Sequence, residues 1–241
     1  MRSSLAAAAA ATLALTPTLA LAGADYEGPA WKVAATLDCP AGVGDLTRVS
    51  QSPDGQWCDY EGRRGDTVRL RILPLGGRSP SEALAPARAA LHDLVPVYRE
   101  PIPASYGGEQ GDRADVDLPF LHVHAVGDRA DVRLFGIHVA SQGDNADVKV
   151  GFGHKHSVVH AGLKGAEVVA DDVGRTNASL VYVLAANRRE PSGYRAVGYV
   201  AKGPVSGPMV VAEFRSRDKG HEHTDGDHGD IGRLIDRNIR R

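Results

Sequence analysis

The residues of this chain best suited to chemistry are histidines that recur at a fixed interval. The phrase Gly-Asp-Arg/Asn-Ala-Asp-Val begins at Gly111, Gly127 and Gly143, so a unit of 16 residues occurs three times. Alignment of the units superimposes most of the histidines that follow: His122, His138 and His154; His124 and His156; with His160 nearby. In a parallel stack, equivalent residues lie about 4.8 Å apart. Because imidazole binds zinc, copper and nickel, the pattern predicts either a surface site for a divalent metal or a histidine-rich face without a ligand.

The same units also superimpose aspartates, in the sets Asp112, Asp128, Asp144 and Asp115, Asp131, Asp147. Calcium takes carboxylate oxygens, but the chain lacks the Gly-Gly-x-Gly-x-Asp signature of calcium-binding β-rolls. The first aspartate of each unit also suits an Asx turn that bonds its own backbone. The turn is therefore the preferred interpretation, and a calcium site is the alternative.

Motifs typical of enzymes do not occur. We find no Gly-x-Ser-x-Gly elbow, no phosphate-binding P-loop and no His-Glu-x-x-His. Residues 221–228, His-Glu-His-Thr-Asp-Gly-Asp-His, could bind metal loosely, although their composition equally suits a solvated linker. We assign no catalytic residue and no cofactor beyond a divalent metal.

The two cysteines, Cys39 and Cys58, are predicted to form a disulfide. An even, well-separated pair in an exported protein favours this pairing over a thiol nucleophile or a metal ligand. On the chain-entropy model, closing a loop of about 20 residues stabilises the fold by roughly 3 kcal/mol.

The first 22 residues have the features of a secretory signal. Arg2 is followed by an Ala- and Leu-rich stretch that ends in Ala20-Leu21-Ala22. We therefore expect a periplasmic or secreted protein with no transmembrane segment after the signal is removed. The formal charge is −2 for all 241 residues, which argues against nucleic acid as a partner.

Residues 23–95 are expected to form an α+β unit. Strands are predicted at 31–37, 46–50, 56–61 and 67–73, with a turn at 52–55. One helix follows, with Ser79 as N-cap, Pro80 at the first position and Glu82 completing a capping box. Pro86 is a defect in this helix because it removes a hydrogen bond.

Residues 96–111 are rich in proline and glycine and are predicted to be a linker. The repeat region, 112–177, then has two possible arrangements: a small parallel β-solenoid, which we prefer, or an antiparallel meander of hairpins. In each unit the alternation of apolar residues changes phase, as between Leu118 and Leu121, which indicates a corner or tight turn.

The last part of the chain is predicted to be an antiparallel meander at 178–217, then a His- and Asp-rich linker and a short helix within 218–241. Ile231, Leu234, Ile235 and Ile239 form one apolar stripe of that helix, which must dock because a dozen residues are marginal alone. The predicted fold class is thus mainly β with a small α component.

Several short segments resemble uncharacterised exported proteins of alphaproteobacteria. They are residues 37–40, 46–50, 55–60, 73–77 and 194–199. Some similar sequences carry methyltransferase labels, but the chain has no Gly-rich strand-to-helix loop that would support them. Residues 112–170 separately resemble, in pattern only, the β-solenoid of bacterial putative adhesin domains.

From these observations we predict an envelope protein with a non-catalytic role in binding or scaffolding, whose partner is an envelope protein or a surface ligand. One alternative is a metal-binding envelope protein that uses the histidine and aspartate columns. Another is an enzyme such as a hydrolase or, on the label alone, a methyltransferase.

Overall fold

The computed structural model describes residues 28–62, 65–96, 113–118, 121–126, 129–134, 137–142, 146–152, 155–162, 165–186, 188–217 and 229–240. Between residues 113 and 156 it defines strands and their register. The predicted signal, nearly all of the predicted linker and the His-rich tail lie outside the described residues. The mainly β fold class is confirmed. Within the described residues, no helix is long and apolar enough to cross a membrane.

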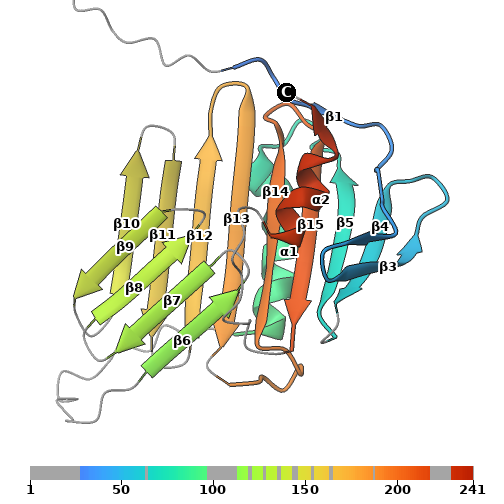
Figure 1. The fold of residues 1–241 in the computed structure, drawn as a ribbon. Helices are drawn as coiled ribbons and strands as arrows, with labels where there is room; N and C mark the ends of the chain where they lie inside the picture. Colours follow the sequence, from blue (N-terminus) through green and yellow to red (C-terminus); the bar gives the residue numbers. More distant parts are fainter. Residues whose placement is uncertain are drawn as a thin grey trace, which may run out of the picture.

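Ten antiparallel strands form the central sheet, in the order β10-β11-β12-β13-β14-β15-β5-β4-β3-β2 (Figure 1). Their bounds, in chain order, are Gly42–Val43 (β2), Leu46–Gln51 (β3), Trp57–Gly62 (β4), Thr67–Leu73 (β5), Ala146–Phe152 (β10), Lys155–Gly162 (β11), Gly165–Val173 (β12), Asn177–Ala186 (β13), Ala196–Pro204 (β14) and Met209–Ser216 (β15). The predicted N-terminal strands and the C-terminal meander join in this sheet, because β5 pairs with β15.

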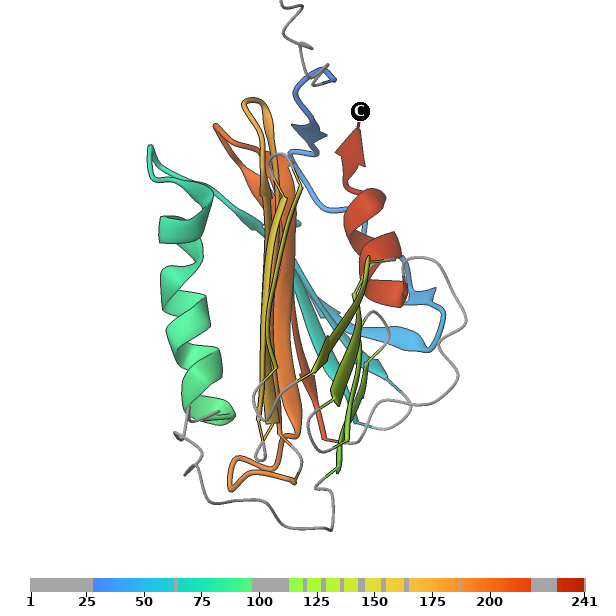
Figure 2. The same ribbon diagram turned by 90° about the vertical axis from the view of Figure 1, so that its left-hand side faces the viewer.

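One face of the sheet is covered by helix α1, Pro80–Leu94, which packs on β13 and β14 (Figure 2). Its apolar residues Ala83, Leu84 and Leu91 are buried against alternate residues of the strands, such as Leu180 and Leu184. The predicted capping box is present: the Ser79 hydroxyl accepts from the Glu82 amide, and the Glu82 carboxylate accepts from the Ser79 amide.

The opposite face is covered at one end by the N-terminal segment and by helix α2, Asp230–Asp236. The predicted Cys39–Cys58 disulfide is present, with the two Cα atoms 6.4 Å apart. It ties the segment before β2 to β4. Both cysteines are buried in the same core as Ile231, Leu234 and Ile235 of α2, so the terminal helix docks as predicted.

The chain ends pair in a way that the sequence did not predict. Only Lys32–Val33 (β1), not all of 31–37, is a strand, and it pairs with Ile239–Arg240 (β16). Ile239 therefore belongs to a strand rather than to the terminal helix. Asn238, which is 1 % exposed, accepts from the Asp38 amide and donates to two carbonyls, so it closes α2 against the N-terminal segment.

The repeat region is divided between two sheets. The first two units form a four-stranded sheet of Arg113–Leu118 (β6), Leu121–Val126 (β7), Arg129–Leu134 (β8) and Ile137–Gln142 (β9), whereas β10 and β11 of the third unit belong to the central sheet. The small sheet lies on the α2 side of the central sheet (Figure 2), where β6 contacts β12. Ala166 and Val168 of β12 are accordingly buried.

Every pair of strands in the repeat region is antiparallel. The preferred parallel solenoid is therefore wrong, and the meander is correct. The reason is the length of the connections: Leu118 pairs with Leu121, and Val126 with Arg129. Two intervening residues can only reverse the chain, since a parallel neighbour requires a long crossover. The change of phase between Leu118 and Leu121 marks this reversal, because hairpin partners share a face.

Candidate functional site

A polar surface lies on the α1 side of the central sheet, over β4, β5 and β15. We call it the open face and define it by seven residues: Trp57, Asp59, Glu61, Thr67, Arg69, Arg71 and Glu213. All seven are half-buried or exposed. The alternate residues of the same strands, such as Tyr60, Leu70 and Phe214, are buried on the other face. Strand alternation thus places a charged surface directly behind the disulfide-containing core.

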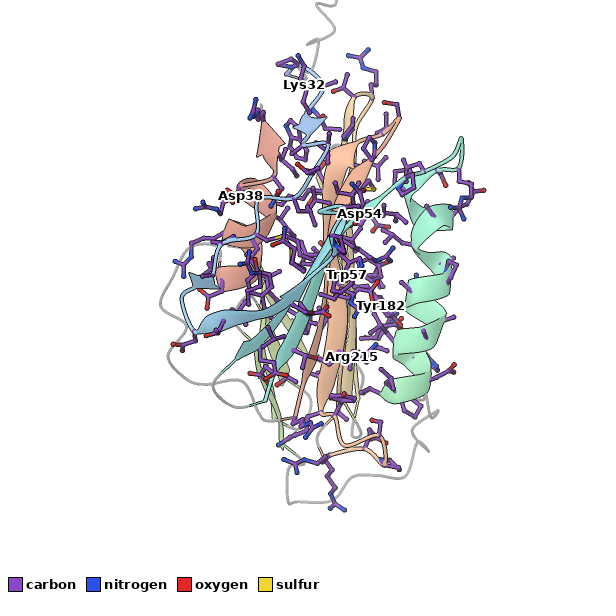
Figure 3. All side chains as sticks on the ribbon, turned by 90° about the vertical axis from the view of Figure 1, so that its right-hand side faces the viewer. Lys32, Asp38, Asp54, Trp57, Tyr182 and Arg215 are labelled. Carbon is purple, nitrogen blue, oxygen red and sulfur yellow. A yellow bond between two sulfur atoms is a disulfide. The ribbon has the colours of Figure 1, made fainter. Side chains whose placement is uncertain are left out.

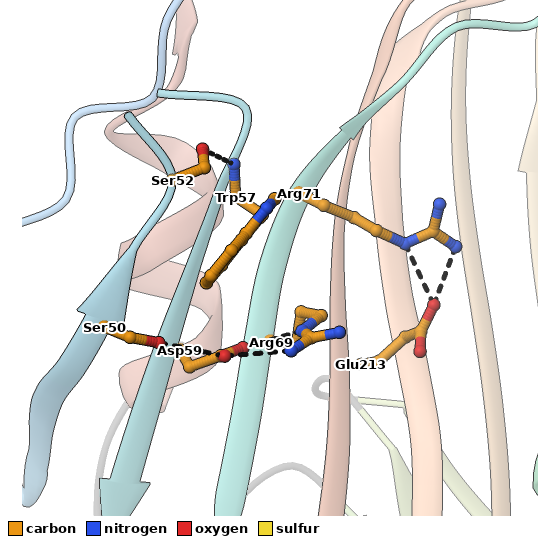
Figure 4. A network of polar contacts seen from close by, with 7 residues as sticks. All are labelled: Ser50, Ser52, Trp57, Asp59, Arg69, Arg71 and Glu213. Carbon is orange, nitrogen blue, oxygen red and sulfur yellow. Dashed lines mark hydrogen bonds and ion pairs between the residues drawn. The ribbon is translucent and has the colours of Figure 1, made fainter. Parts of the chain in front are cut away.

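The turn that precedes β4 positions Trp57. The Ser52 hydroxyl, in a side chain that is buried, accepts hydrogen bonds from the amides of Gln56 and Trp57 at 2.8 and 3.0 Å. Gly55 adopts a φ of +68°, which glycine tolerates best. The predicted turn at 52–55 is therefore present, and it directs the chain into β4 with Trp57 on the open face (Figure 4).

Arg69 is held by two neighbours on the open face. It forms a two-point ion pair with Asp59, with nitrogen–oxygen distances of 2.7 and 2.9 Å. Its guanidinium carbon also lies 5.2 Å from the centre of the Trp57 ring, within the range of a cation–π contact. The hydroxyl of Ser50 donates at 3.0 Å to Oδ2 of Asp59, which also accepts from a terminal nitrogen of Arg69. Arginine, tryptophan and carboxylate are thus ordered together across three strands.

A second ion pair extends the array to β15. Arg71 donates from Nε and from a terminal nitrogen to the same oxygen of Glu213, at 3.0 and 2.7 Å (Figure 4). The register also places Arg69 between Asp59 and Glu213, so positive and negative groups alternate across the sheet.

The electrostatics of the open face suit binding better than proton transfer. The hydrogen bond from Arg69 is the main reason that the pKa of Asp59 lies below its ordinary value of 3.8. The same bond raises the pKa of Arg69. Both groups therefore stay charged at neutral pH, as paired donors and acceptors. A general acid or base needs a pKa near the working pH.

A second polar cluster lies beneath α1. Arg88 of the helix pairs with Glu167 of β12 at 3.0 Å, and its guanidinium carbon is 4.5 Å from the centre of the Tyr182 ring. Tyr182 and Tyr199 are buried, with ring centres 5.7 Å apart. Both tyrosines are buried and the Glu167 side chain is 16 % exposed, so the contacts of Arg88 with them fix α1 to the sheet.

The structure does not form the predicted histidine columns. His122 lies opposite Asp117 on one side and Arg133 on the other. His138 lies opposite Arg133 on the next strand, so Arg133 stands between the two histidines in the sheet. His156 and His160 lie on β11, in the other sheet, and His154 is outside the described residues. His124 lies in β7. The sequence predicted that it would stand beside His156, which lies in β11. The columns required a parallel stack, and antiparallel pairing removes it.

The aspartates are likewise not stacked. Asp115 and Asp131 lie on either side of His124, and Asp147 lies opposite His160 in the central sheet. Asp112, Asp128 and Asp144 are outside the described residues. Among the side chains that the structure describes, no three His, Cys, Asp or Glu residues gather closely enough to hold a metal ion.

Sequence reasoning missed the open face, although a signal was present. Thr67, Arg69 and Arg71 alternate with apolar residues in β5, as do Asp59 and Glu61 with Cys58 and Tyr60 in β4. We used this alternation only to predict strands. The pairing of oppositely charged positions on adjacent strands could have been proposed from the same pattern.

Comparison with known proteins adds no assignment to this geometry. No protein-family model, no curated protein and no solved structure matches the chain.

Proposed function

We propose that this protein is an exported envelope protein that binds a partner protein through the open face, without catalysis. The observation that carries the proposal is the ordered array of Trp57, Arg69 and Asp59 on an exposed sheet surface. Tryptophan and arginine are the residues most enriched in the energetic centres of protein interfaces. The predicted signal and the buried disulfide support export to an oxidising compartment.

The Arg69–Asp59 ion pair contributes little to folding, which leaves binding as its better explanation. Arg69 is 55 % exposed and Asp59 is 23 % exposed, and exposed pairs typically contribute no more than about 1 kcal/mol to stability. Arg69 is nonetheless held in one orientation by Asp59 and Trp57. A side chain ordered in advance loses less entropy when it binds.

Site-specific photo-crosslinking in cells tests the proposal. A photoreactive residue at Glu61, on the open face, should give one discrete crosslinked partner in the envelope fraction, whereas the same residue at Val173, which is 39 % exposed on β12, should not. Mass spectrometry of the same fraction should show a chain that starts near Gly23. Equal crosslinking at both positions, or an intact N-terminus, contradicts the proposal.

Once that partner is identified, Trp57→Ala should weaken its affinity by about 10- to 30-fold, the usual loss for a central interface residue. Trp31→Ala is the matched control, because Trp31 is the other tryptophan and is also half-buried. Circular dichroism should show both variants folded. Equal losses for the two variants would assign the partner to a different surface.

A further inference from the structure

Arginines gather at one end of the central sheet. β13 ends at Ala186, β14 begins at Ala196 and β15 ends at Ser216, and antiparallel pairing brings these three points together. The connection 187–195 and the end of β15 carry five arginines, which we call the basic end: Arg188, Arg189, Arg195, Arg215 and Arg217. Four of them, all except Arg195, are exposed.

The basic end is built on an ordered support. The Glu190 amide donates to the Tyr194 carbonyl at 2.9 Å, and the Gly193 amide to the Glu190 carbonyl at 2.8 Å, which closes a turn. The hydroxyl of Ser192 donates to the carbonyl of Leu94 at 2.6 Å, so the connection is attached to the last turn of α1. The arginines are therefore displayed on a defined platform.

The two segments of the basic end are also joined directly. Arg189 donates to the main-chain carbonyl of Arg217 at 3.0 Å, and the guanidinium carbon of Arg217 lies 5.8 Å from the centre of the Tyr194 ring. A carbonyl and an aromatic ring carry no formal charge, so these two contacts do not neutralise the guanidinium groups.

Among the described residues, carboxylates are scarce within the connection and the end of β15 themselves, whereas Glu61 and Asp66 lie at the same end of the neighbouring strands β4 and β5. Glu190 is the one acidic residue that the structure describes within 188–195 and 215–217. Within the described part of the chain, no ion pair joins Arg188, Arg189, Arg215 or Arg217 to a carboxylate. A concentrated positive patch on a chain of net charge −2 is complementary to an anionic partner.

We propose that the basic end docks the protein on a membrane surface that contains anionic phospholipid. Arg188 and Arg189 lie on the connection that leaves β13, and Arg215 and Arg217 lie at the last residues of β15 and just after it, so the charges gather at one end of the sheet. Tyr194 adds an amphipathic ring of the kind that is enriched at membrane interfaces. Each arginine near an anionic bilayer contributes a several-fold gain in partition. The basic end adjoins the open face, because Arg215 pairs with Thr67 and lies two residues after Glu213 on β15, but docking on a lipid surface needs no protein partner.

Vesicle cosedimentation of the full chain tests this proposal. The vesicles are phosphatidylcholine with roughly one third phosphatidylglycerol, and pure phosphatidylcholine supplies the background to be subtracted. The test variant is Arg188→Gln/Arg215→Gln, because neither side chain forms an ion pair with a residue that the structure describes. It should partition about 25-fold more weakly than the parent.

The matched control is Lys32→Gln/Arg240→Gln. It removes the same two charges from exposed residues of β1 and β16. Figure 3 places Lys32 at the end of the molecule away from Arg215, and β14 alone spans about 30 Å between those ends. This variant should partition within about 2-fold of the parent. The interaction of a charge with the membrane is largely screened when the two lie more than about 10 Å apart.

Three outcomes overturn the proposal. Equal losses in the two variants would mean that net charge, not the basic end, controls partition. Partition of the parent that does not fall between about 0.05 and 0.5 M salt would exclude an electrostatic contact. Tighter binding to heparin than to anionic vesicles, with the same sensitivity to Arg188 and Arg215, would assign the basic end to a soluble polyanion.

Discussion

Tyr199 shows how a single buried group can set the response of this protein to pH. The residue is 5 % exposed, in the cluster beneath α1, and burial raises the pKa of its hydroxyl above the ordinary value of 10. Burial likewise raises the pKa of Tyr182. The native state therefore keeps these phenols protonated at a pH where the unfolded chain loses the protons.

We predict that the protein loses stability as the pH rises above about 10. Because the folded pKa is raised, the stabilisation is fully present below pH 10 and declines above it. Tyr199→Phe should reduce the drop in melting temperature between pH 8 and pH 11, since one of the two phenols no longer titrates. Tyr194→Phe, at the half-exposed connection, serves as the control. An unchanged drop in Tyr199→Phe would show that another group controls alkaline unfolding.

Helix α1 shows how far local signals determine an element. Ser79, Pro80 and Glu82 predicted its start correctly, because capping involves residues that are adjacent in the chain. Pro86 lies inside the helix without ending it. Its ring removes the hydrogen bond to the carbonyl of Glu82, but both residues are exposed, so water can satisfy that carbonyl.

Pro86→Ala should therefore stabilise the protein, by about 1–3 kcal/mol, through restoration of one helical hydrogen bond. The urea midpoint measures this change. Ser79→Ala, on the same helix, should lower the free energy of unfolding by about 1 kcal/mol, and the urea midpoint with it, because it removes the N-cap. A lower midpoint for Pro86→Ala would indicate that the proline ring makes a stabilising contact.

The strands show what local sequence signals leave undetermined. Alternation in β5 predicted a strand with one buried face, and the structure has it. Alternation does not say which strand lies beside β5. The neighbour is β15, and Arg71 therefore pairs with Glu213, which is 142 residues away in the sequence. The Arg71–Glu213 part of the open face therefore required the three-dimensional arrangement, even though both residues lie in strands that were predicted.

At the scale of the whole molecule, the first and the last described segments of the chain close the core together. The disulfide fixes the N-terminal segment over β4, and Asp38 of that segment pairs with Arg237 at 2.9 Å. Asn238 adds hydrogen bonds to the same segment. The disulfide thus restrains the segment on which the terminal helix docks.

Replacement of both cysteines, Cys39→Ser/Cys58→Ser, should cost about 3 kcal/mol and lower the melting temperature by about 6–12 °C for a chain of this size. Calorimetry with and without reductant measures it. The reductant should affect only the parent protein. If the double variant has the same melting temperature as the parent, the packing of α2 alone holds the N-terminal segment.

The sequence by itself determined those features that depend on neighbouring residues: the strands, the capped helix, the turn at 52–55 and the meander at 178–217. It also predicted the disulfide, because the chain has only two cysteines to pair. Only the tertiary structure decided how the repeats assemble, which strands are neighbours and where the charges gather. The reason is that strand pairing joins residues far apart in the chain, and apolar alternation is the same whether the neighbouring strand is parallel or antiparallel.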